Sequence, residues 1–289
     1  MMKNLSALIN AELDGQIVTT SYYKNPTSAT AVGNWFDLSM SPGTPTPNYY
    51  ATTPLTSTQF GQNESNGLYV GQAISPKTRG IRQIGMTVKN TGSPRGTPFI
   101  LCDYLMYYSF CDMGLSDWQY MNNTTTLPRY DFGQVIAVCV GSPSGVGNPR
   151  FQIKYTNQDG VSGRISPIIA TGTQSSVGTI LNAASNAINT GAQAAGPFLP
   201  LQNGDFGVRS IEAIQFLDSD YGLVSLCIVK PICSAAIINN NAMEKDFIIQ
   251  AGGEVPIVKD DAYLNFIFFC NDNSFASNPI LGYINFVFN

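Results

Sequence analysis

Histidine is absent from this chain of 289 residues. Histidine is the commonest general base and the commonest protein ligand for metals, so its absence excludes Ser-His-Asp and Cys-His catalysis and every zinc site that contains histidine. The sequence also lacks a phosphate-binding loop, a GxGxxG motif and a GxSxG motif. We therefore predict a protein that is not an enzyme and that has no catalytic residues, no cofactor and no bound metal.

Charged residues are scarce as well. They make up 12% of the chain, against about a quarter in ordinary soluble domains. So few charges suggest that other subunits cover much of the surface, or that amides and hydroxyls keep the protein soluble. The net charge of −4 and the pI near 4.8 argue against general binding to nucleic acid or to anionic membranes.

One basic cluster interrupts this pattern. We interpret it as a solvated or interface face, with a phosphate-binding patch as the alternative. It consists of Lys77, Arg79, Arg82, Lys89 and Arg95.

Paired cysteine motifs are missing too, since none of the six cysteines forms a CxxC pair. Four lie in apolar runs, where cysteine usually acts as a small buried hydrophobe, so we predict free thiols. The N-terminus has no signal-peptide core, and no apolar run reaches the roughly 18 residues that span a bilayer. We expect synthesis in the cytoplasm and no membrane insertion. The cysteines are Cys102, Cys111, Cys139, Cys227, Cys233 and Cys270.

Most of the sequence consists of short segments in which apolar and polar residues alternate, as in β-strands. Apolar residues are clearly spaced as in a helix only in residues 4–13. That helix could pack on its own β core or on a neighbouring subunit. Segment 171–195 predicts a short helix or a long loop, and segment 243–250 has mixed signals. Strands are predicted at 16–23, 33–40, 80–89, 99–110, 134–140, 150–156, 161–170, 208–217, 221–231, 262–270 and 279–288.

Two hairpins are predicted from the turn residues between strands. Residues 90–96 are rich in turn formers and connect strands 80–89 and 99–110. The turn Asn157–Gly160 connects strand 150–156 to 161–170.

The rest of the chain is expected to be organised around the stretch 196–217. Its prolines exclude a helix and its glycines allow tight bends, so an extended arm and a turn should precede a strand that starts at Val208. Arg209, Glu212 and Gln215 should face outward from that strand, and we expect the Phe206 ring to be buried beside it.

The predicted fold class is all-β: a jelly-roll-like β-sandwich with long loops and a short N-terminal helix. Residues 1–30 form a helix and arm, and residues 31–289 form the sandwich. The alternative is two smaller β-sandwich domains divided near residues 141–149, where glycine and proline are frequent.

Few carboxylates are candidates for chemistry. Asp103 is the only charge in an apolar strand; it could be a functional carboxylate with a raised pKa, but we favour pairing with an arginine or an outward orientation. Asp218/Asp220 and Asp260/Asp261 are pairs, and Asn271–Asn273 is rich in oxygen ligands. A glycosidase or calcium site would need more than these, so we interpret them as turn residues.

Two tyrosine pairs could stack on sugars. They are Tyr49-Tyr50 and Tyr107-Tyr108. Because aromatic residues are frequent throughout the chain, packing in the core or in an interface is the favoured interpretation.

Six segments resemble a family of uncharacterised structural proteins encoded by tailed bacteriophages. The likeness extends over most of the chain beyond residue 30, and it carries over no catalytic residues. The segments are 33–43 (GNWFDLSMSPG), 100–105 (ILCDYL), 127–130 (LPRY), 155–164 (YTNQDGVSGR), 196–211 and 259–264 (KDDAYL).

The resemblance implies a virion component, with a capsid decoration, cement or other head-associated role favoured over a tail role. The expected partners are other virion proteins, first the major capsid protein, and further copies of the chain, with a trimer as one option. The expected location is the virion, assembled in the cytoplasm of the bacterial host. The alternatives are a tail or head adhesin that binds host glycan through tyrosine-rich loops and, last, a β-sandwich hydrolase.

Overall fold

A computed structural model gives the structure of residues 5–26, 33–61, 66–89, 97–141, 149–172, 176–182, 196–218, 220–238, 242–248, 255–270 and 278–288. The turn predicted at 90–96, the Asn271–Asn273 group and most of segments 141–149 and 171–195 lie outside these residues. No helix in the described ranges is long and apolar enough to cross a membrane.

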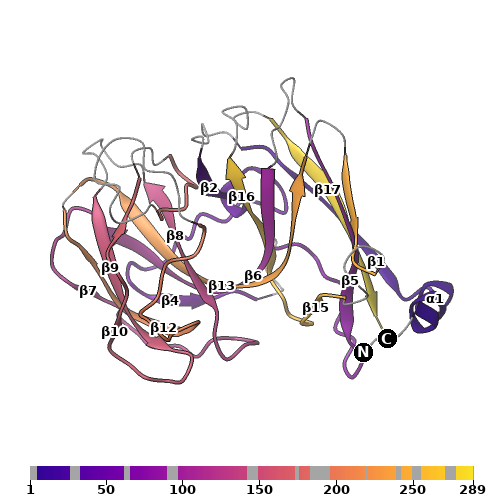
Figure 1. Cartoon of the computed structure of the whole chain (residues 1–289), viewed down its shortest axis with the longest axis horizontal. Coiled ribbons are helices and arrows are strands. Elements are labelled where there is room, and N and C mark those ends of the chain that lie inside the picture. The colour runs from indigo at the N-terminus through magenta and orange to yellow at the C-terminus, as the bar shows by residue number, and fades with distance from the viewer. Residues whose placement is uncertain are drawn as a thin grey trace.

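Three antiparallel sheets make up the fold, and sheet II lies between the other two (Figure 1). Sheet I has the order β14 (Met243–Asp246), β5 (Arg79–Val88), β17 (Ile280–Phe288), β1 (Ile17–Lys24) and β3 (Gly43–Thr44), with β15 (Ile257–Val258) also paired to β5. Sheet II has the order β2 (Asn34–Asp37), β16 (Leu264–Cys270), β6 (Thr97–Asp112), β13 (Leu223–Ile237) and β8 (Gln134–Gly141), with β4 (Ser57–Gln59) also paired to β6. Sheet III has the order β10 (Arg164–Ile165), β9 (Arg150–Asn157), β12 (Val208–Phe216) and β7 (Gln119–Tyr120), with β11 (Ile169–Ala170) also paired to β9.

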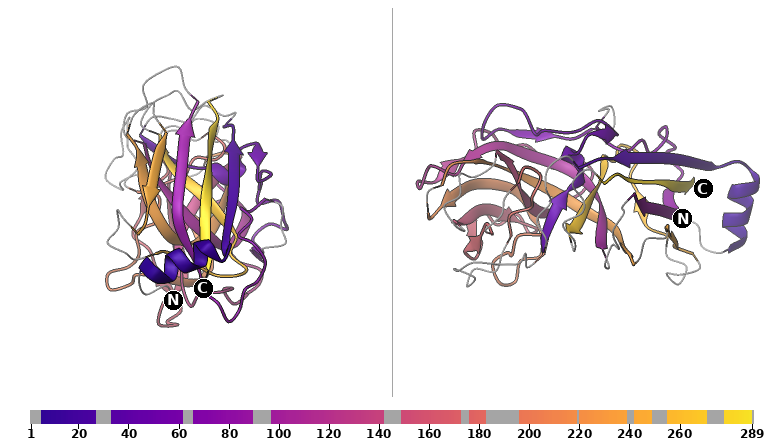
Figure 2. Two further views of the ribbon diagram at one scale, coloured as in Figure 1. Left: turned by 90° about the vertical axis from the view of Figure 1, so that its right-hand side faces the viewer. Right: turned by 90° about the horizontal axis from the view of Figure 1, so that it is seen from above.

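The predicted all-β sandwich class, with long loops and a short N-terminal helix, is confirmed. That helix, α1 (Leu5–Leu13), lies across the ends of the sheet I strands (Figure 2). Leu8 and Ala11 pack on Val287 of β17, with Ile248 beside them. Of the two options for this helix, the structure therefore has it on the chain's own β core.

Strands β6 and β13 are long enough to serve two cores. Phe99 and Leu101 of β6 face sheet I in the first core, whereas Leu105 and Tyr108 face sheet III in the second. Strand β6 precedes segment 141–149 and β13 follows it, yet the two strands pair with each other in sheet II.

Pro231 lies inside β13, a position that a central strand normally excludes because proline cannot donate to a ladder. The pairing between β8 and β13 ends at Val229, two residues earlier, so Pro231 has a strand partner only on the β6 side. A register shift also follows it, between Pro231 and Cys233.

Sheet II curls until both of its edge strands bond to one segment, residues 176–182. The Asp37 amide of β2 donates to the Gly178 carbonyl at 2.8 Å, and the Cys139 amide of β8 donates to the Thr179 carbonyl at 2.9 Å. A third core fills the concave side and includes Tyr104, Tyr107 and Val229. The curl thus closes around a core of its own.

The two hairpin predictions have opposite outcomes. β9 pairs with β10 and β11 as expected, although the returning strand is interrupted around Pro167. The predicted hairpin between strands 80–89 and 99–110 does not form, so that prediction is wrong: β5 pairs in sheet I and β6 pairs in sheet II. Both strands have a buried apolar face, and they pack these faces together across the first core, which contains Ile84 and Leu101.

Strand 33–40 is shorter than predicted. β2 ends at Asp37, and a single 3₁₀ turn, Leu38–Met40, follows. The Asp37 side chain accepts a hydrogen bond from the Ser39 amide and thereby caps this turn.

Candidate functional site

Three polar clusters, each centred on a buried aspartate side chain, connect distant segments of the chain. The first lies between the first and second cores, around Asp103 of β6. The Arg129 guanidinium donates to both carboxylate oxygens, Nη2 to Oδ1 at 2.8 Å and Nε to Oδ2 at 3.1 Å. The Tyr263 amide donates to Oδ1 at 3.0 Å. Arg129 also donates to the carbonyls of Phe60 and Tyr104, each at 2.8 Å.

Burial raises the pKa of Asp103 to about 6 and outweighs the hydrogen bonds from Arg129, which lower it. The favoured interpretation of Asp103 as an arginine-paired carboxylate is therefore confirmed, and its pKa is raised as well. Because both side chains are almost completely buried and Arg129 connects its own segment to β6 and to the loop at Phe60, this pair acts as a structural tie at the junction of two cores.

The second cluster lies against the third core. Asp37 has no exposed surface, and it accepts hydrogen bonds from the Ser39 hydroxyl and the Tyr104 hydroxyl, each at 2.7 Å, and from the Tyr50 hydroxyl. Burial raises the pKa of Asp37, although these hydrogen bonds favour its charged form.

Lys24 is buried next to this cluster. Its ammonium group donates to the carbonyls of Ser39 at 3.3 Å, Ser41 at 3.1 Å and Thr46 at 3.5 Å. Burial lowers the pKa of Lys24 to about 8, while the charge of Asp37 acts in the opposite direction. Lys24 thus fixes the loop after β2 against the end of β1.

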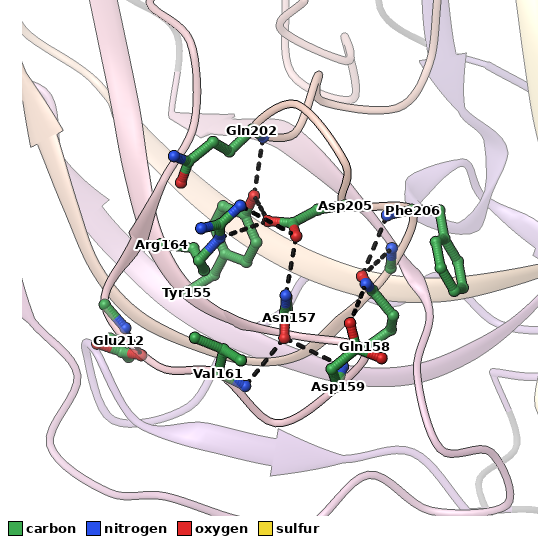
Figure 3. A network of polar contacts seen from close by, with 12 residues as sticks. Tyr155, Asn157, Gln158, Asp159, Val161, Arg164, Gln202, Asp205, Phe206 and Glu212 are labelled. Atoms are coloured by element: carbon green, nitrogen blue, oxygen red, sulfur yellow. Dashed lines mark hydrogen bonds and ion pairs between the residues drawn. The ribbon is translucent and has the colours of Figure 1, made fainter.

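The third cluster surrounds Asp205, in the turn before β12 (Figure 3). Its carboxylate accepts hydrogen bonds from Tyr155 at 2.7 Å, Asn157 at 2.8 Å and Arg164 at 2.9 Å. The Gln202 amide donates to the Tyr155 hydroxyl at 2.9 Å and so joins the arm to the hairpin. Partial burial works to raise the pKa of Asp205, but the three donors prevail and lower it to about 2.

Asp205 should make stability sensitive to acid. Its folded pKa of about 2 lies below the ordinary value of 3.8, so its stabilising contribution is complete above pH 4 and is lost as the pH falls through 3.8 towards 2. Asp205→Asn should lower stability at pH 7 and flatten the loss between pH 4 and 2. Urea unfolding of both proteins across this range is the measurement, and parallel pH profiles would contradict the assignment.

The carboxylate pairs do not form a two-carboxylate site. Asp218 pairs with Arg150 at 2.7 Å, and Asp260 pairs with Arg79 at 3.2 Å. Asp261 lies 3.8 Å from Arg129. Each of these three aspartates thus faces a different arginine, and Arg129 is shared between Asp261 and Asp103. Among the described residues, no group of three or more cysteines, aspartates or glutamates could hold a metal ion.

The predicted basic cluster does not assemble into one face. Arg79 is buried against Asp260, and Arg82 pairs with Glu12 and Asp246. The ammonium group of Lys77 lies 5.9 Å from the centre of the Phe288 ring. The two arginines therefore form ion pairs with carboxylates of the chain itself. For Arg79, both the solvated or interface face and the phosphate-binding patch are wrong. Arg95 lies outside the described residues.

Three of the four paired tyrosines cannot reach a sugar. Tyr50, Tyr107 and Tyr108 are buried, and only Tyr49 is exposed. The packing interpretation is thus confirmed for these three residues. The six cysteines are free, as predicted, and all but Cys233 are fully buried.

The expectation that Phe206 is buried is wrong, since 58% of its surface is exposed. Its ring meets Phe132 edge-on, with the ring centres 5.3 Å apart, and the Lys230 ammonium lies 4.5 Å from the centre of the Phe132 ring. Phe206→Ala should therefore change the free energy of unfolding by about 0.5 kcal/mol or less, as other surface substitutions do. If urea unfolding instead showed that Phe206→Ala loses several kcal/mol in the free energy of unfolding, the Phe206 ring would have to be buried.

The exposed face of sheet I is covered by polar side chains that bond to each other across strands. Thr19 donates to Asn285 at 2.7 Å, Asn285 donates to Gln83 at 2.9 Å, and Gln83 donates to Glu244. Tyr283 donates to Glu244 at 3.1 Å. The sequence showed only that these residues alternate with apolar ones, because the partners lie far apart along the chain.

The exposed face of sheet III follows the same rule. Gln152 of β9 donates to Gln215 of β12 at 2.9 Å, and Thr156 donates to Glu212 at 2.9 Å. The predicted outward orientation of Glu212 and Gln215 agrees with this arrangement. Both outer faces therefore present polar groups that already have partners within the chain.

A shallow, open depression of about 470 Å³ lies on sheet I, between the tyrosines Tyr23 and Tyr283. Ser21, Thr44 and Leu281 complete its surface. Aromatic rings beside hydroxyl groups are suited to stacking on a sugar, although the depression is open to solvent.

Comparison with known proteins identifies no family. No protein-family model matches the chain, and no curated protein matches it. Among solved structures it is similar to the infectious bursal disease virus VP2 subviral particle, at 8% identity with a TM-score of 0.18, over 94% of this chain and 80% of that one. A structure of the Gt strain of the same virus gives 8% identity and a TM-score of 0.19 over the same shares. TM-scores this low do not demonstrate a common fold.

Proposed function

We propose that this chain is a non-enzymatic structural subunit of a tailed-phage virion, of the capsid decoration or cement type. It would bind the capsid lattice, with the major capsid protein as its first partner, and stabilise the particle by burying apolar and amide surface. The family resemblance supports the virion class, and the surface described above supports the structural role.

The observation that carries the proposal is the character of the two outer faces. Their polar groups are hydrogen-bonded to each other, so covering them leaves few groups without a partner and avoids the main cost of burying polar surface. Large apolar side chains are exposed elsewhere on the chain as well, among them Leu13, Tyr120 and Tyr221. A surface with few charges and with exposed aromatic side chains is suited to burial against other subunits.

The three buried clusters support the same role. Each connects segments that are distant in the chain: Arg129 joins β6 to the loop at Phe60, and Asp205 joins the arm to the hairpin at Tyr155. Buried polar networks whose members are bonded to each other make a fold rigid. A rigid subunit loses little conformational entropy when it docks on a lattice.

The proposal predicts that the particle needs this chain for its stability. Particles assembled without the chain should release their genome at a lower temperature than complete particles, and adding the purified chain back should restore the release temperature. Release is measured with a DNA-binding dye during heating. Equal release temperatures with and without the chain would overturn the cement role.

The depression between Tyr23 and Tyr283 favours one second candidate, an adhesin that binds glycan on the host surface. Sugar binding on a glycan array that disappears in Tyr23→Ala and persists in Tyr49→Ala would support it. Tyr23 is the right probe because its ring is exposed and lines the depression, whereas Tyr49 is exposed elsewhere.

A further inference from the structure

β1 is the last long strand at one side of sheet I (Figure 2). On its inner side it pairs with β17 over all eight residues. On its outer side, β3 pairs only with Tyr23 and Lys24. The rest of that side, from Ile17 to Ser21, has no strand partner among the described residues.

The hydrogen-bond pattern shows which backbone groups this edge presents. The Phe288 amide donates to the Gln16 carbonyl at 3.2 Å, and in an antiparallel ladder every second residue bonds to the same neighbour. Val18, Thr20 and Tyr22 therefore bond to β17. Ile17, Thr19 and Ser21 direct their amide and carbonyl groups outward, and we call these three residues the open edge. In the part of the chain that the structure describes, no backbone hydrogen bond reaches them from that side.

Other sheet edges of the described fold have the protection that edge strands normally need. Both edges of sheet II bond to residues 176–182. β14 contains the charged residues Glu244, Lys245 and Asp246, and the edge strands of sheet III are two residues long. β1 differs, since residues 17–23 contain no charge and no proline and their register with β17 has no bulge.

We propose that the open edge pairs with the open edge of a second copy of this chain, antiparallel, around a two-fold axis at Thr19. Ile17 then lies opposite the partner's Ser21, and Thr19 lies opposite the partner's Thr19. These are hydrogen-bonded positions on both strands, so the three pairs form six backbone hydrogen bonds and sheet I continues across the dimer.

The charge pattern specifies a second copy as the occupant. At a two-fold axis each residue faces the same stretch of its partner, so a charge on the edge would meet a like charge nearby and weaken the pairing. The edge carries none, although the chain as a whole is acidic. Exposed apolar surface is present there, because Ile17 of the open edge is 36% exposed and Tyr69, whose carbonyl accepts a hydrogen bond from the Thr20 hydroxyl, is 51% exposed.

This dimer is independent of the virion proposal, and it differs from the trimer that is one option for a virion subunit. An edge that pairs with itself is complete with two copies and cannot join a third.

Charge exchange at Thr19 tests the pairing, with sedimentation velocity of the purified full chain as the measurement. We expect the wild-type chain to be a dimer. Thr19→Lys and Thr19→Glu should each be monomeric, because like charges then meet at the axis, and an equimolar mixture should form the dimer again. Thr19→Val, which keeps the backbone amide and adds no charge, should dimerise like wild type.

Two further variants test the geometry. Thr19→Pro removes an outward amide and no bond to β17, so it should keep the wild-type melting temperature and weaken dimerisation by about tenfold or more, or about 1.4 kcal/mol. Thr19→Cys should form a disulfide-linked dimer in mild oxidant, because hydrogen-bonded pairs have Cα atoms about 5.5 Å apart, within disulfide reach. Tyr120→Cys, on the exposed part of β7, is the control. On denaturing gels it should run as a monomer both with reductant and after treatment with the oxidant.

A wild-type chain that is monomeric or trimeric at micromolar concentrations would overturn the proposal. A dimer would also overturn it if the Lys and Glu variants dimerised alone, or if their mixture stayed monomeric while both variants kept their folded melting temperatures.

Discussion

Replacing Arg129 with methionine should lower the free energy of unfolding by about 3–5 kcal/mol at pH 7, as expected when one partner of a buried ion pair is removed. Asp103 would keep only the Tyr263 amide as a donor, in a place where its side chain has no exposed surface. The carboxyl group would then take up a proton, which costs about 4 kcal/mol at pH 7 for a group with an ordinary pKa.

Because protonation of Asp103 causes the loss of stability in Arg129→Met, that loss depends on pH. In Arg129→Met the pKa of Asp103 is raised further above its ordinary value, so the folded state binds a proton that the unfolded state lacks. Stability must then rise as the pH falls, by about 1.4 kcal/mol per unit. The deficit relative to wild type should therefore shrink between pH 7 and pH 5, measured by urea unfolding.

A double variant separates the charge from the packing. Asp103→Leu combined with Arg129→Met removes both charges, so it should be more stable than Arg129→Met alone, although the bonds to Phe60 and Tyr104 are still lost. A loss of less than about 1 kcal/mol at pH 7 in Arg129→Met would mean that Arg129 is not a structural tie between the two cores.

Tyr50→Ala should cost about 3–5 kcal/mol, the range for removing a large buried aromatic side chain. The Tyr50 ring packs edge-on against Tyr107, with the ring centres 5.3 Å apart, and its hydroxyl donates to Asp37. The substitution would leave a cavity in the third core and remove one donor from a fully buried carboxylate.

Tyr49→Ala is the matched control, since it removes the same side chain one residue earlier, where the ring is 56% exposed. Its effect should stay within about 0.5 kcal/mol. Tyr50→Phe should lie between the two, because it keeps the ring and loses only the hydroxyl bond, at about 1–3 kcal/mol. Equal stabilities of the two alanine variants in thermal unfolding would contradict the placement of Tyr50.

Local pattern was sufficient to predict much of the strand content. The alternation in β9 and β12 is visible in the sequence because each strand has one buried and one exposed face, and the turn Asn157–Gly160 closes the hairpin as expected. The position of Phe206 could not be derived this way, because the glycines around it let the chain point the ring either inward or outward.

The sheet partners and the polar clusters lay beyond local pattern. β5 and β6 have the composition of a hairpin, and only the full set of partners assigns them to different sheets. Asp103 could be recognised as unusual, but its partner Arg129 is 26 residues away on an irregular segment. Asp205 lies in the turn expected before β12, and its role depends on Arg164, from the neighbouring hairpin.

The copy number of this chain in purified particles tests the proposed role most directly. Quantitative mass spectrometry against the major capsid protein gives the ratio. A decoration or cement subunit occupies the repeated positions of a symmetric lattice, so the expected ratio is about one third or more. A ratio of about a few per cent or less would place the chain at the tail or at a single vertex, contradict the cement role, and leave the adhesin as the leading candidate.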